Sequence, residues 1–376
     1  MKILLVAEYY IPHIGGVEVL FSNIAKRMAD LCHATSVVTA RLPGTRKEET
    51  IEGVKVFRVK VPSRAGRYWF TVLSIPEILK RAKEADFIHS TTWTGAFPAW
   101  LVARLRGKRC VITVHEVNTP VWQYLGKKGP VLWLHKLYEK TLFKLPFYKY
   151  IAVSKYTKDC LTRYFNIPAR KIDVIYNGID YDCFDPTKAS DSLVRKKLEL
   201  DSEFVYMYYG RPGFTKGVEY LIQAVPLISK RILNSKLLLI LANDPKDRYE
   251  NIKKMIADLY IENEIMLLDP VPRNELPDYI AASDCVVVPS LSEGFGFTAA
   301  EACAMGKPVV ASNVASLPEI VSGKYVLVEP RSPEAIAEGV EKVYKGEVES
   351  SEQKVFSWDK CVDGYFKVYE NVMVSE

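Results

Sequence analysis

The sequence predicts an α/β protein made of two Rossmann-like domains, and three observations support this fold class. Short apolar runs alternate with segments of helical periodicity from the first residue to about residue 330. The runs lack the apolar/polar alternation of half-exposed strands, so we expect strands buried on both faces, as in parallel sheets. The pattern restarts near residue 204, and a chain of 376 residues suits two or three domains of ~150 residues each.

The expected elements follow in chain order. In the first half the strands are 3–7, 36–40, 87–90, 110–115 and 150–154, and the clearest helices are 17–31 and 94–105. In the second half the strands are 204–210, 236–242, 265–268, 285–289 and 308–311, and the helices are 218–232, 249–260 and 297–305.

The domain boundary is expected at the turn-rich stretch 176–186, which contains Asn-Gly and Asp-Pro. This divides the chain into residues 1–175 and 176–355. The remainder, 356–376, reads as an amphipathic helix that could close either half. We expect it to pack back towards the N-terminal domain.

Composition excludes several classes of protein. Hydrophobic residues make up 48% of the chain and charged residues 26%, which rules out disorder, collagen and coiled coil. No run approaches the ~18 apolar residues of a spanning helix. The seven cysteines are odd in number and form no C-x-x-C pair, so neither a disulfide framework nor a zinc site is expected. A reducing cytoplasm is the simplest compartment.

The two halves differ in charge. Residues 1–175 carry 29 Lys and Arg against 13 Asp and Glu, a balance of +16. The rest of the chain has 22 against 32, a balance of −10. The first half should attract anions, which could be nucleic acid, an anionic membrane surface or a phosphorylated acceptor. A basic surface without a ligand is the alternative.

A glycine pair follows the first strand. Gly15 and Gly16 stand where the chain enters the helix 17–31, and paired glycines at such a turn expose amides that suit an anion or a sugar hydroxyl. The spacing is not G-x-G-x-x-G, which disfavours a dinucleotide-binding oxidoreductase. A purely structural turn is the alternative.

Two cations follow the first strand of the second half. Arg211 and Lys216 lie in Gly210-Arg-Pro-Gly-Phe-Thr-Lys-Gly217, which is not a Walker loop because no Ser or Thr follows the lysine. Five residues apart on a turn, they can converge on one phosphate group. The sequence therefore predicts a pyrophosphate clamp, and two solvated loop cations are the alternative.

Two carboxylates flank a Gly-x-Gly turn between a strand and a helix. Glu293 precedes Gly294-Phe295-Gly296-Phe297, and Glu301 follows in the first turns of the helix. Both carboxylates can face the crevice at the strand ends, where α/β sheets bind ligands. Carboxylates accept from vicinal hydroxyls and turn amides suit phosphate, so sugar and ribose are the expected partners. Acids favoured by the helix dipole are the alternative.

In this order and spacing, the motifs resemble those of the retaining glycosyltransferases of family 4, which have the two-domain glycosyltransferase B fold with a cleft between the domains. The resemblance covers most of the chain. It rests on Gly15-Gly16, Val153-Ser154, Asn177-Gly-Ile-Asp180, G-R-x4-K-G at 210–217, the pair Glu293/Glu301, and Glu301-Ala302-x-Ala304-x-Gly306-x-Pro308-Val309.

The resemblance implies that a nucleotide-diphosphate sugar binds mainly to the C-terminal half and the acceptor mainly to the N-terminal half, with closure assembling the site. It implies sugar transfer with retention by a front-face route, in which the leaving phosphate helps deprotonate the acceptor. No metal or cofactor is implied. The base is not indicated, because Asp269-Pro-Val-Pro272 replaces the usual glycine at the start of the base-binding loop.

Roles carry over by match of motif. Arg211 and Lys216 would hold the diphosphate and stabilise the leaving group. Glu293 would contact donor-sugar hydroxyls, Glu301 the ribose, and the amides of residues 294–297 the sugar and phosphate. His115, at the end of the strand 110–115, matches a histidine that reaches the donor sugar. For His115 alone, a buried core histidine is the alternative. Ala242-Asn-Asp-Pro245 departs from the usual G-x-G-P, which puts amide contacts there in doubt.

The basic half contains a lysine stripe. Lys136, Lys140 and Lys144 fall on one face of a helical stretch, 127–145, whose other positions include Trp133, Leu137 and Tyr138, and 64–70 is a second basic-aromatic piece. A peripheral membrane contact and a lipid-linked or glycan acceptor are one interpretation. A core helix with a solvated lysine stripe is the other. The motifs give nucleic acid no role.

Two rival functions remain. One is a sugar-nucleotide epimerase or phosphorylase on the same fold, which would turn over without a separate acceptor. The other is a non-catalytic sugar-nucleotide binding protein, against which the presence of both carboxylates argues.

Overall fold

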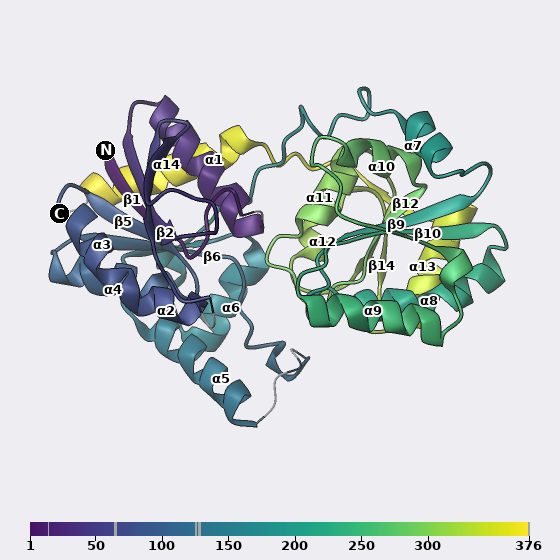
Figure 1. Cartoon of the computed structure of the whole chain (residues 1–376), viewed down its shortest axis with the longest axis horizontal. Coiled ribbons are helices and arrows are strands. Elements are labelled where there is room, and N and C mark those ends of the chain that lie inside the picture. Colours follow the sequence, from purple (N-terminus) through teal and green to yellow (C-terminus); the bar gives the residue numbers. More distant parts are fainter. Residues whose placement is uncertain (14, 64–65, 125, 127–128, 375–376) are drawn as a thin grey trace. The chain divides into compact units, whose positions relative to one another are not determined.

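The computed structural model describes residues 1–13, 15–63, 66–124, 126 and 129–374. The chain divides into two compact units (Figure 1). Unit 1 holds the described residues of 1–122, 127–178 and 358–376, and unit 2 those of 123–126 and 179–357. The main boundary between the two units falls between Gly178 and Ile179, slightly later than the boundary expected at 175/176. The chain returns to unit 1 at Trp358.

Unit 1 contains an eight-stranded sheet in the order β3-β4-β2-β1-β5-β6-β7-β8. All neighbouring strands pair in parallel except β3 and β4, which form an antiparallel hairpin at one edge. The sequence patterns did not predict this hairpin or β8. The strands are β1 Lys2–Val6, β2 Ala34–Ala40, β3 Glu48–Ile51, β4 Val54–Val59, β5 Phe87–Thr91, β6 Arg109–Val114, β7 Lys149–Ala152 and β8 Ile172–Val174.

Helices cover both faces of this sheet, with α1 and α14 on one face and α2, α3 and α4 on the other (Figure 1). The helices are α1 Gly16–Asp30, α2 Gly66–Leu73, α3 Ile75–Arg81, α4 Ala96–Leu105, α5 Gly129–Lys144, α6 Lys155–Phe165 and α14 Trp358–Val374. Because both faces are covered, β1 and β5 are buried along almost their whole length, which explains the apolar run from Ile3 to Val6.

The C-terminal helix α14 lies in unit 1, although more than half of the chain separates it from β5. The Oη atom of Tyr369 lies 2.7 Å from Nδ1 of His89 in β5, and Tyr365 contacts Thr113 of β6 at 3.1 Å. All four side chains are buried, so these hydrogen bonds satisfy polar groups that the core would otherwise leave unpaired.

Unit 2 contains a seven-stranded sheet in the order β11-β10-β9-β12-β13-β14-β15, parallel except for the edge strand β15. The strands are β9 Phe204–Gly210, β10 Ser235–Leu241, β11 Ile265–Leu268, β12 Cys285–Val288, β13 Val309–Ser312, β14 Gly323–Val328 and β15 Glu349–Ser351. The helices are α7 Asp191–Lys197, α8 Val218–Arg231, α9 Lys246–Asp258, α10 Leu276–Ala282, α11 Phe297–Ala304, α12 Leu317–Ile320 and α13 Pro333–Lys345.

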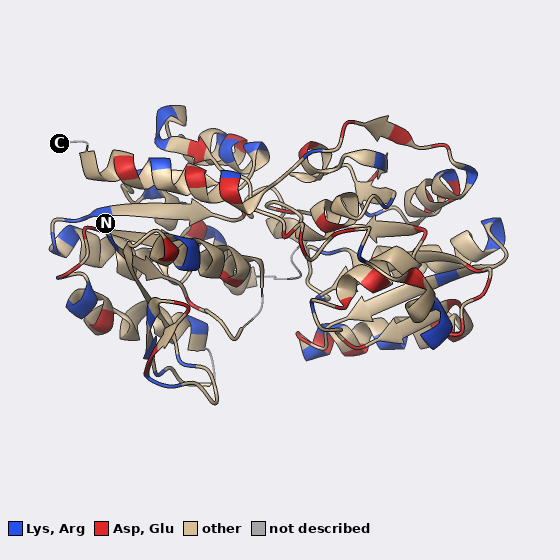
Figure 2. Cartoon of the chain, turned by 90° about the horizontal axis from the view of Figure 1, so that it is seen from above, with Lys and Arg blue, Asp and Glu red and all other residues tan. Residues whose placement is uncertain are grey.

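In unit 2, α8, α9 and α13 lie along one face of the sheet and α10 and α11 along the other (Figure 1). Two parallel sheets flanked by helices confirm the predicted fold class. Lys, Arg, Asp and Glu lie chiefly on helices and loops (Figure 2), and the central strands β5, β9 and β12 carry none of them. All seven cysteines are free. Within the described ranges, no helix combines the length and apolarity needed to cross a membrane.

Candidate functional site

The strand order of unit 2 reverses between β9 and β12. The chain adds β10 and β11 on one side of β9 and then places β12 and β13 on the other. At such a switch point the loops that follow the two central strands run in opposite directions. They leave a crevice for a ligand at the carboxyl ends of these strands. Here these loops are 211–217 and 289–296, which carry the predicted cations and carboxylate.

A close backbone contact holds the two loops together. The amide of Leu291 donates to the carbonyl of Thr215 at 2.7 Å. Gly217 has a φ of +64°, and a Cβ there would overlap the carbonyl oxygen of Pro289. Only glycine allows this approach, which places Lys216 directly beside the loop of Glu293.

The structure joins Lys216 and Glu293 in an ion pair. Lys216 Nζ lies 2.7 Å from Glu293 Oε1, and the hydroxyl of Ser290 donates to the same oxygen at 2.8 Å. The Glu293 side chain is 11% exposed and that of Lys216 is 36% exposed. The lysine therefore keeps access to solvent while it compensates the charge of a nearly buried carboxylate.

Arg211 lies at the end of β9 with its side chain exposed. Among the described residues no ion pair or side-chain hydrogen bond engages its guanidinium. Its main-chain oxygen accepts a 3.2 Å hydrogen bond from the hydroxyl of Tyr208, which fixes the start of the loop. Burial raises the pKa of Tyr208, so its hydroxyl stays protonated and able to donate.

The turn between Glu293 and α11 is fixed by Ser316. The Oγ atom of Ser316 lies 3.0 Å from the carbonyl oxygen of Glu293 and 2.9 Å from that of Phe295. Gly296, with a φ of +94°, then starts α11. The first amides of a helix have no intrahelical acceptor, so this turn can offer donors to an oxygen-rich ligand at the switch point.

Glu301 is 3% exposed and is held by two residues that the sequence analysis missed. Arg273 Nη2 lies 2.7 Å from Oε1, and the hydroxyl of Tyr209 donates to Oε2 at 3.1 Å. Burial raises the pKa of Glu301, whereas the charge and hydrogen bond of Arg273 oppose that rise. Tyr209 directly precedes the Gly210-Arg211 motif, and Arg273 directly follows Asp269-Pro-Val-Pro272, the segment that departs from the usual start of the base-binding loop.

The switch point of unit 1 lies between β1 and β5. Glu8, after β1, places Oε2 2.5 Å from the hydroxyl of Thr94, after β5, and 3.5 Å from Nη2 of Arg67. Glu8 is 8% exposed, and its Oε1 has no partner among the described residues. A buried carboxylate oxygen at this edge can accept a hydrogen bond from a hydroxyl group. Neither Glu8 nor Thr94 belongs to a motif that the sequence analysis identified.

The glycine turn of unit 1 starts α1. Gly15 is its N-cap in an extended conformation, and Gly16, the first helical residue, is exposed. A Cβ on Gly15 would overlap the Glu18 carboxylate, whose Oε1 lies 2.9 Å from His13 Nδ1.

His115 follows β6 at the same edge of the sheet. Burial lowers its pKa from 6.5 to about 4, and the charge of Glu18 opposes the shift. The imidazole is therefore neutral at pH 7. Its Nε2 is buried without a partner in the described part of the chain. A neutral imidazole whose Nε2 has no partner can form a hydrogen bond with a hydroxyl group of a ligand.

The predicted residues thus fall into two groups. Unit 1 holds Gly15, Gly16 and His115, and unit 2 brings together the loops of Arg211, Lys216, Glu293 and residues 294–297, with Glu301 in the helix that follows. Across the described ranges, no three His, Cys, Asp or Glu side chains are grouped as metal ligands.

Comparison with known proteins identifies the family. Residues 14–182 match the model of glycosyltransferase family 4, and residues 190–355 match that of glycosyl transferases group 1. An uncharacterized glycosyltransferase of Methanocaldococcus jannaschii is 28% identical over 99% of both chains. A D-inositol 3-phosphate glycosyltransferase of Salinispora arenicola is 26% identical over 94% of this chain and 87% of its own.

A solved structure of similar fold is HepE of Anabaena in complex with UDP and glucose. It has a TM-score of 0.76 at 19% identity and covers 98% of this chain and 99% of its own. This likeness identifies the fold of the present chain, with its two α/β units, as the glycosyltransferase B fold. With both halves matched by family models and both sheets matched in space, the chain belongs to the group 1/family 4 glycosyltransferases.

Proposed function

We propose that this glycosyltransferase moves a sugar, with retention and without a metal ion, from a nucleotide-diphosphate sugar to an acceptor hydroxyl. The observation that carries the proposal is the Lys216–Glu293 pair beside Arg211 at the switch point of unit 2. The complex of HepE with UDP and glucose supports a donor of this class.

The diphosphate meets Arg211 and Lys216. A lysine ammonium has three N–H donors, and one of them is directed to Glu293, so two remain for phosphate oxygens. Arg211 adds a planar fork that suits a second oxygen. As the bond from sugar to phosphate breaks, negative charge grows on the leaving diphosphate, and both cations stabilise it.

The two carboxylates bind different parts of the donor. Glu293 is held in place by Lys216 and Ser290 and accepts a hydroxyl of the donor sugar. Glu301 accepts the ribose hydroxyls with the lone pairs that Arg273 and Tyr209 leave open. Neutral His115 in unit 1 contacts a donor-sugar hydroxyl through Nε2. The leaving phosphate takes the proton of the acceptor hydroxyl on the same face of the sugar.

The acceptor is proposed to be lipid-linked, because α5 presents an apolar surface to solvent instead of packing it into a core. Trp133 is 61% exposed and Leu134 55% exposed. The inner face is fixed by the buried Glu139, which accepts hydrogen bonds from the Asn118 amide and from Trp122 Nε1, both at 2.6 Å.

The exposed surface continues from α5 onto α2. The hydroxyl of Tyr68 lies 3.1 Å from Nε2 of His135, and Trp69 and Val72 are also exposed. Lys136, Lys140 and Lys144 of α5 are exposed as well. Lysines beside exposed aromatic and aliphatic residues suit the interface of an anionic membrane. We call the side chains 68, 69, 72, 131, 133, 134 and 137 the α2–α5 surface.

The experiment that tests the reaction begins with thermal unfolding in the presence of UDP, GDP, ADP and their sugars. A ligand at 100 times its Kd adds about 2.7 kcal/mol of stability, so the base of the donor is expected to give the largest increase in Tm. Transfer assays with that donor then follow the anomeric configuration of the product by NMR, with and without EDTA.

Retention and full activity in EDTA are the expected results. Stabilisation by none of the nucleotides would contradict a nucleotide-sugar donor. An inverted product would exclude the front-face route, and donor turnover without any acceptor would favour an epimerase or phosphorylase. Loss of activity in EDTA with rescue by Mg²⁺ or Mn²⁺ would contradict a metal-free reaction.

A further inference from the structure

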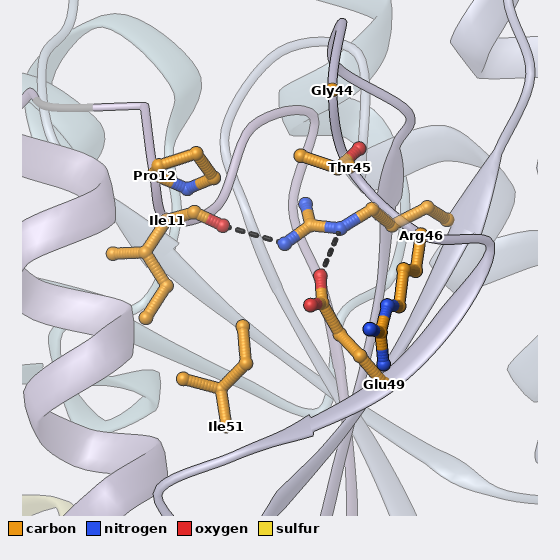
Figure 3. Close-up of a pocket in the computed structure, with 8 residues that line it drawn as sticks. Ile11, Pro12, Gly44, Thr45, Arg46, Glu49 and Ile51 are labelled. Atoms are coloured by element: carbon orange, nitrogen blue, oxygen red, sulfur yellow. Dashed lines mark hydrogen bonds and ion pairs between the residues drawn. The ribbon is translucent and has the colours of Figure 1, made fainter.

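We infer that a pocket in unit 1, formed around Arg58, binds an anionic oxygen group of the phosphate or carboxylate type. That this group belongs to the acceptor rests on the proposed function. The pocket has a volume of about 400 Å³ and is formed by Ile11 and Pro12 after β1, residues 44–46 after β2, and Glu49, Ile51 and Arg58 of the β3–β4 hairpin (Figure 3).

Arg58 is a buried cation with incomplete pairing. Its side chain is fully buried, Nε lies 2.9 Å from Glu49 Oε1, and Nη2 donates to the carbonyl of Ile11 at 2.6 Å, as the dashed lines of Figure 3 mark. Nη1 is buried and has no partner among the described residues. A buried guanidinium N–H without an acceptor is costly, and an oxyanion is the acceptor that matches its geometry.

A second cation gives the pocket a net positive charge. Glu49 alone would neutralise Arg58, but Arg46 also lines the pocket and is exposed. Within the described chain, Arg46 forms no ion pair with any carboxylate. Arg46 is held on the loop between β2 and β3, where the hydroxyl of Thr45 donates to the carbonyl of Leu42 at 2.7 Å. An anion can therefore contact one exposed and one buried guanidinium.

The position in the fold connects this pocket to the reaction. β4 runs parallel to β2, and β2 runs parallel to β1, so Arg58 near the end of β4 lies at the carboxyl edge of the sheet. This is the edge that carries the Gly15–Gly16 turn and His115. The carbonyl that Arg58 holds belongs to Ile11, in the segment that leads from β1 to that turn. An acceptor anchored at Arg58 would have its hydroxyls along the same edge.

Isothermal titration of inorganic phosphate is the first test, and it uses the full chain carrying Arg211→Ala and Lys216→Ala, so that the proposed diphosphate site of unit 2 does not contribute. In this background, Arg46→Glu is expected to weaken phosphate binding at least about tenfold, the scale of one charge-assisted contact. Lys47→Glu is the matched control, because Lys47 is an exposed cation of the same loop that does not line the pocket. Arg58→Lys should also weaken binding, since it keeps the charge and loses the fork.

Each outcome decides the inference. Loss of phosphate binding with Arg46→Glu and not with Lys47→Glu supports the pocket. No phosphate binding in the background protein, an unchanged affinity in Arg46→Glu, or an equal loss in Lys47→Glu overturns it. Glucose 6-phosphate and glucose then test the acceptor: the phosphate ester should bind with the same sensitivity to Arg46→Glu, and glucose should not. Binding of inorganic phosphate but not of glucose 6-phosphate would refute an acceptor site. The nucleotide-binding experiments described above test the proposed sugar transfer independently of this pocket.

Discussion

Lys216 Nζ and Glu293 Oε1 lie 2.7 Å apart at the carboxyl ends of β9 and β12. The two residues come from different loops, and each has a distinct proposed partner in the donor. Their contact means that the cation for the diphosphate and the carboxylate for the sugar position each other before any ligand binds. Substitution of one residue is therefore expected to disturb the role of the other.

Removing the lysine should weaken nucleotide binding. Lys216→Ala is expected to raise the Kd for the nucleoside diphosphate at least about tenfold, because a charge-assisted hydrogen bond contributes about 1.5–3 kcal/mol. Isothermal titration measures this. Lys230→Ala is the matched control, an exposed lysine at the end of α8. If the double variant Lys216→Ala/Glu293→Gln binds as tightly as the wild type, the loss in Lys216→Ala comes from the unpaired Glu293 and the phosphate contact is refuted.

Substitutions of the two carboxylates, Glu293 and Glu301, should affect turnover and ligand binding differently. Glu293→Gln is expected to reduce turnover more than nucleoside-diphosphate binding, because the bare diphosphate lacks the sugar. Glu301→Gln is expected to weaken both, since the ribose is present in both ligands. Initial rates and diphosphate titrations of the two variants, compared with the wild type, provide the measurement. The opposite order of effects would exchange the two roles.

Protonation of His89 should make unit 1 sensitive to acid. Burial lowers the pKa of His89 from 6.5 to about 3. Between these values the unfolded state binds a proton that the native state does not. The free energy of unfolding therefore falls as pH falls below about 6.5, by at most about 1.4 kcal/mol per pH unit from this residue.

Thermal unfolding at several pH values between about 7.5 and 4.5 tests this, with His89→Gln as the comparison. Glutamine keeps hydrogen-bonding groups beside Tyr369 and Thr113 but does not titrate. The variant should lose less stability than the wild type on acidification, while His115 still titrates in both proteins. Parallel curves for the two proteins would show that His89 is not responsible.

The α2–α5 surface should bind anionic membranes. The variant Trp133→Ser/Leu134→Ser is expected to lose co-sedimentation with vesicles that contain anionic lipid, because two large apolar side chains no longer enter the interface. Leu233→Ser is the matched control, since Leu233 of unit 2 is 93% exposed. Wild-type binding should rise with anionic lipid and fall with salt. Vesicle binding that does not depend on lipid charge and salt, or that is unchanged in the double variant, would contradict membrane binding by this surface. A water-soluble acceptor would then be the better interpretation.

The sequence determined the fold class, most of the parallel strands and the positions of the Arg211/Lys216 and Glu293/Glu301 motifs. It could do so because strands buried on both faces need continuous apolar runs, and because glycine turns at strand ends leave local signatures. It missed the β3–β4 hairpin, whose exposed edge strand Glu48–Ile51 is polar and has no apolar run to reveal it. The short edge strand β15 was missed for the same reason.

Only the tertiary structure decided which distant residues meet. Arg273 reaches Glu301, Tyr369 reaches His89, and Arg58 holds the carbonyl of Ile11, and none of these pairs is close in the sequence. Strand order and loop path bring each pair together, and neither is encoded in a local pattern. The sequence could not decide whether Trp133 faces solvent or the core, for a similar reason. Helical spacing of lysines and aromatic residues predicts which residues share a face of α5. Which face is buried depends on the contact of Glu139 with Trp122, which only the tertiary structure shows.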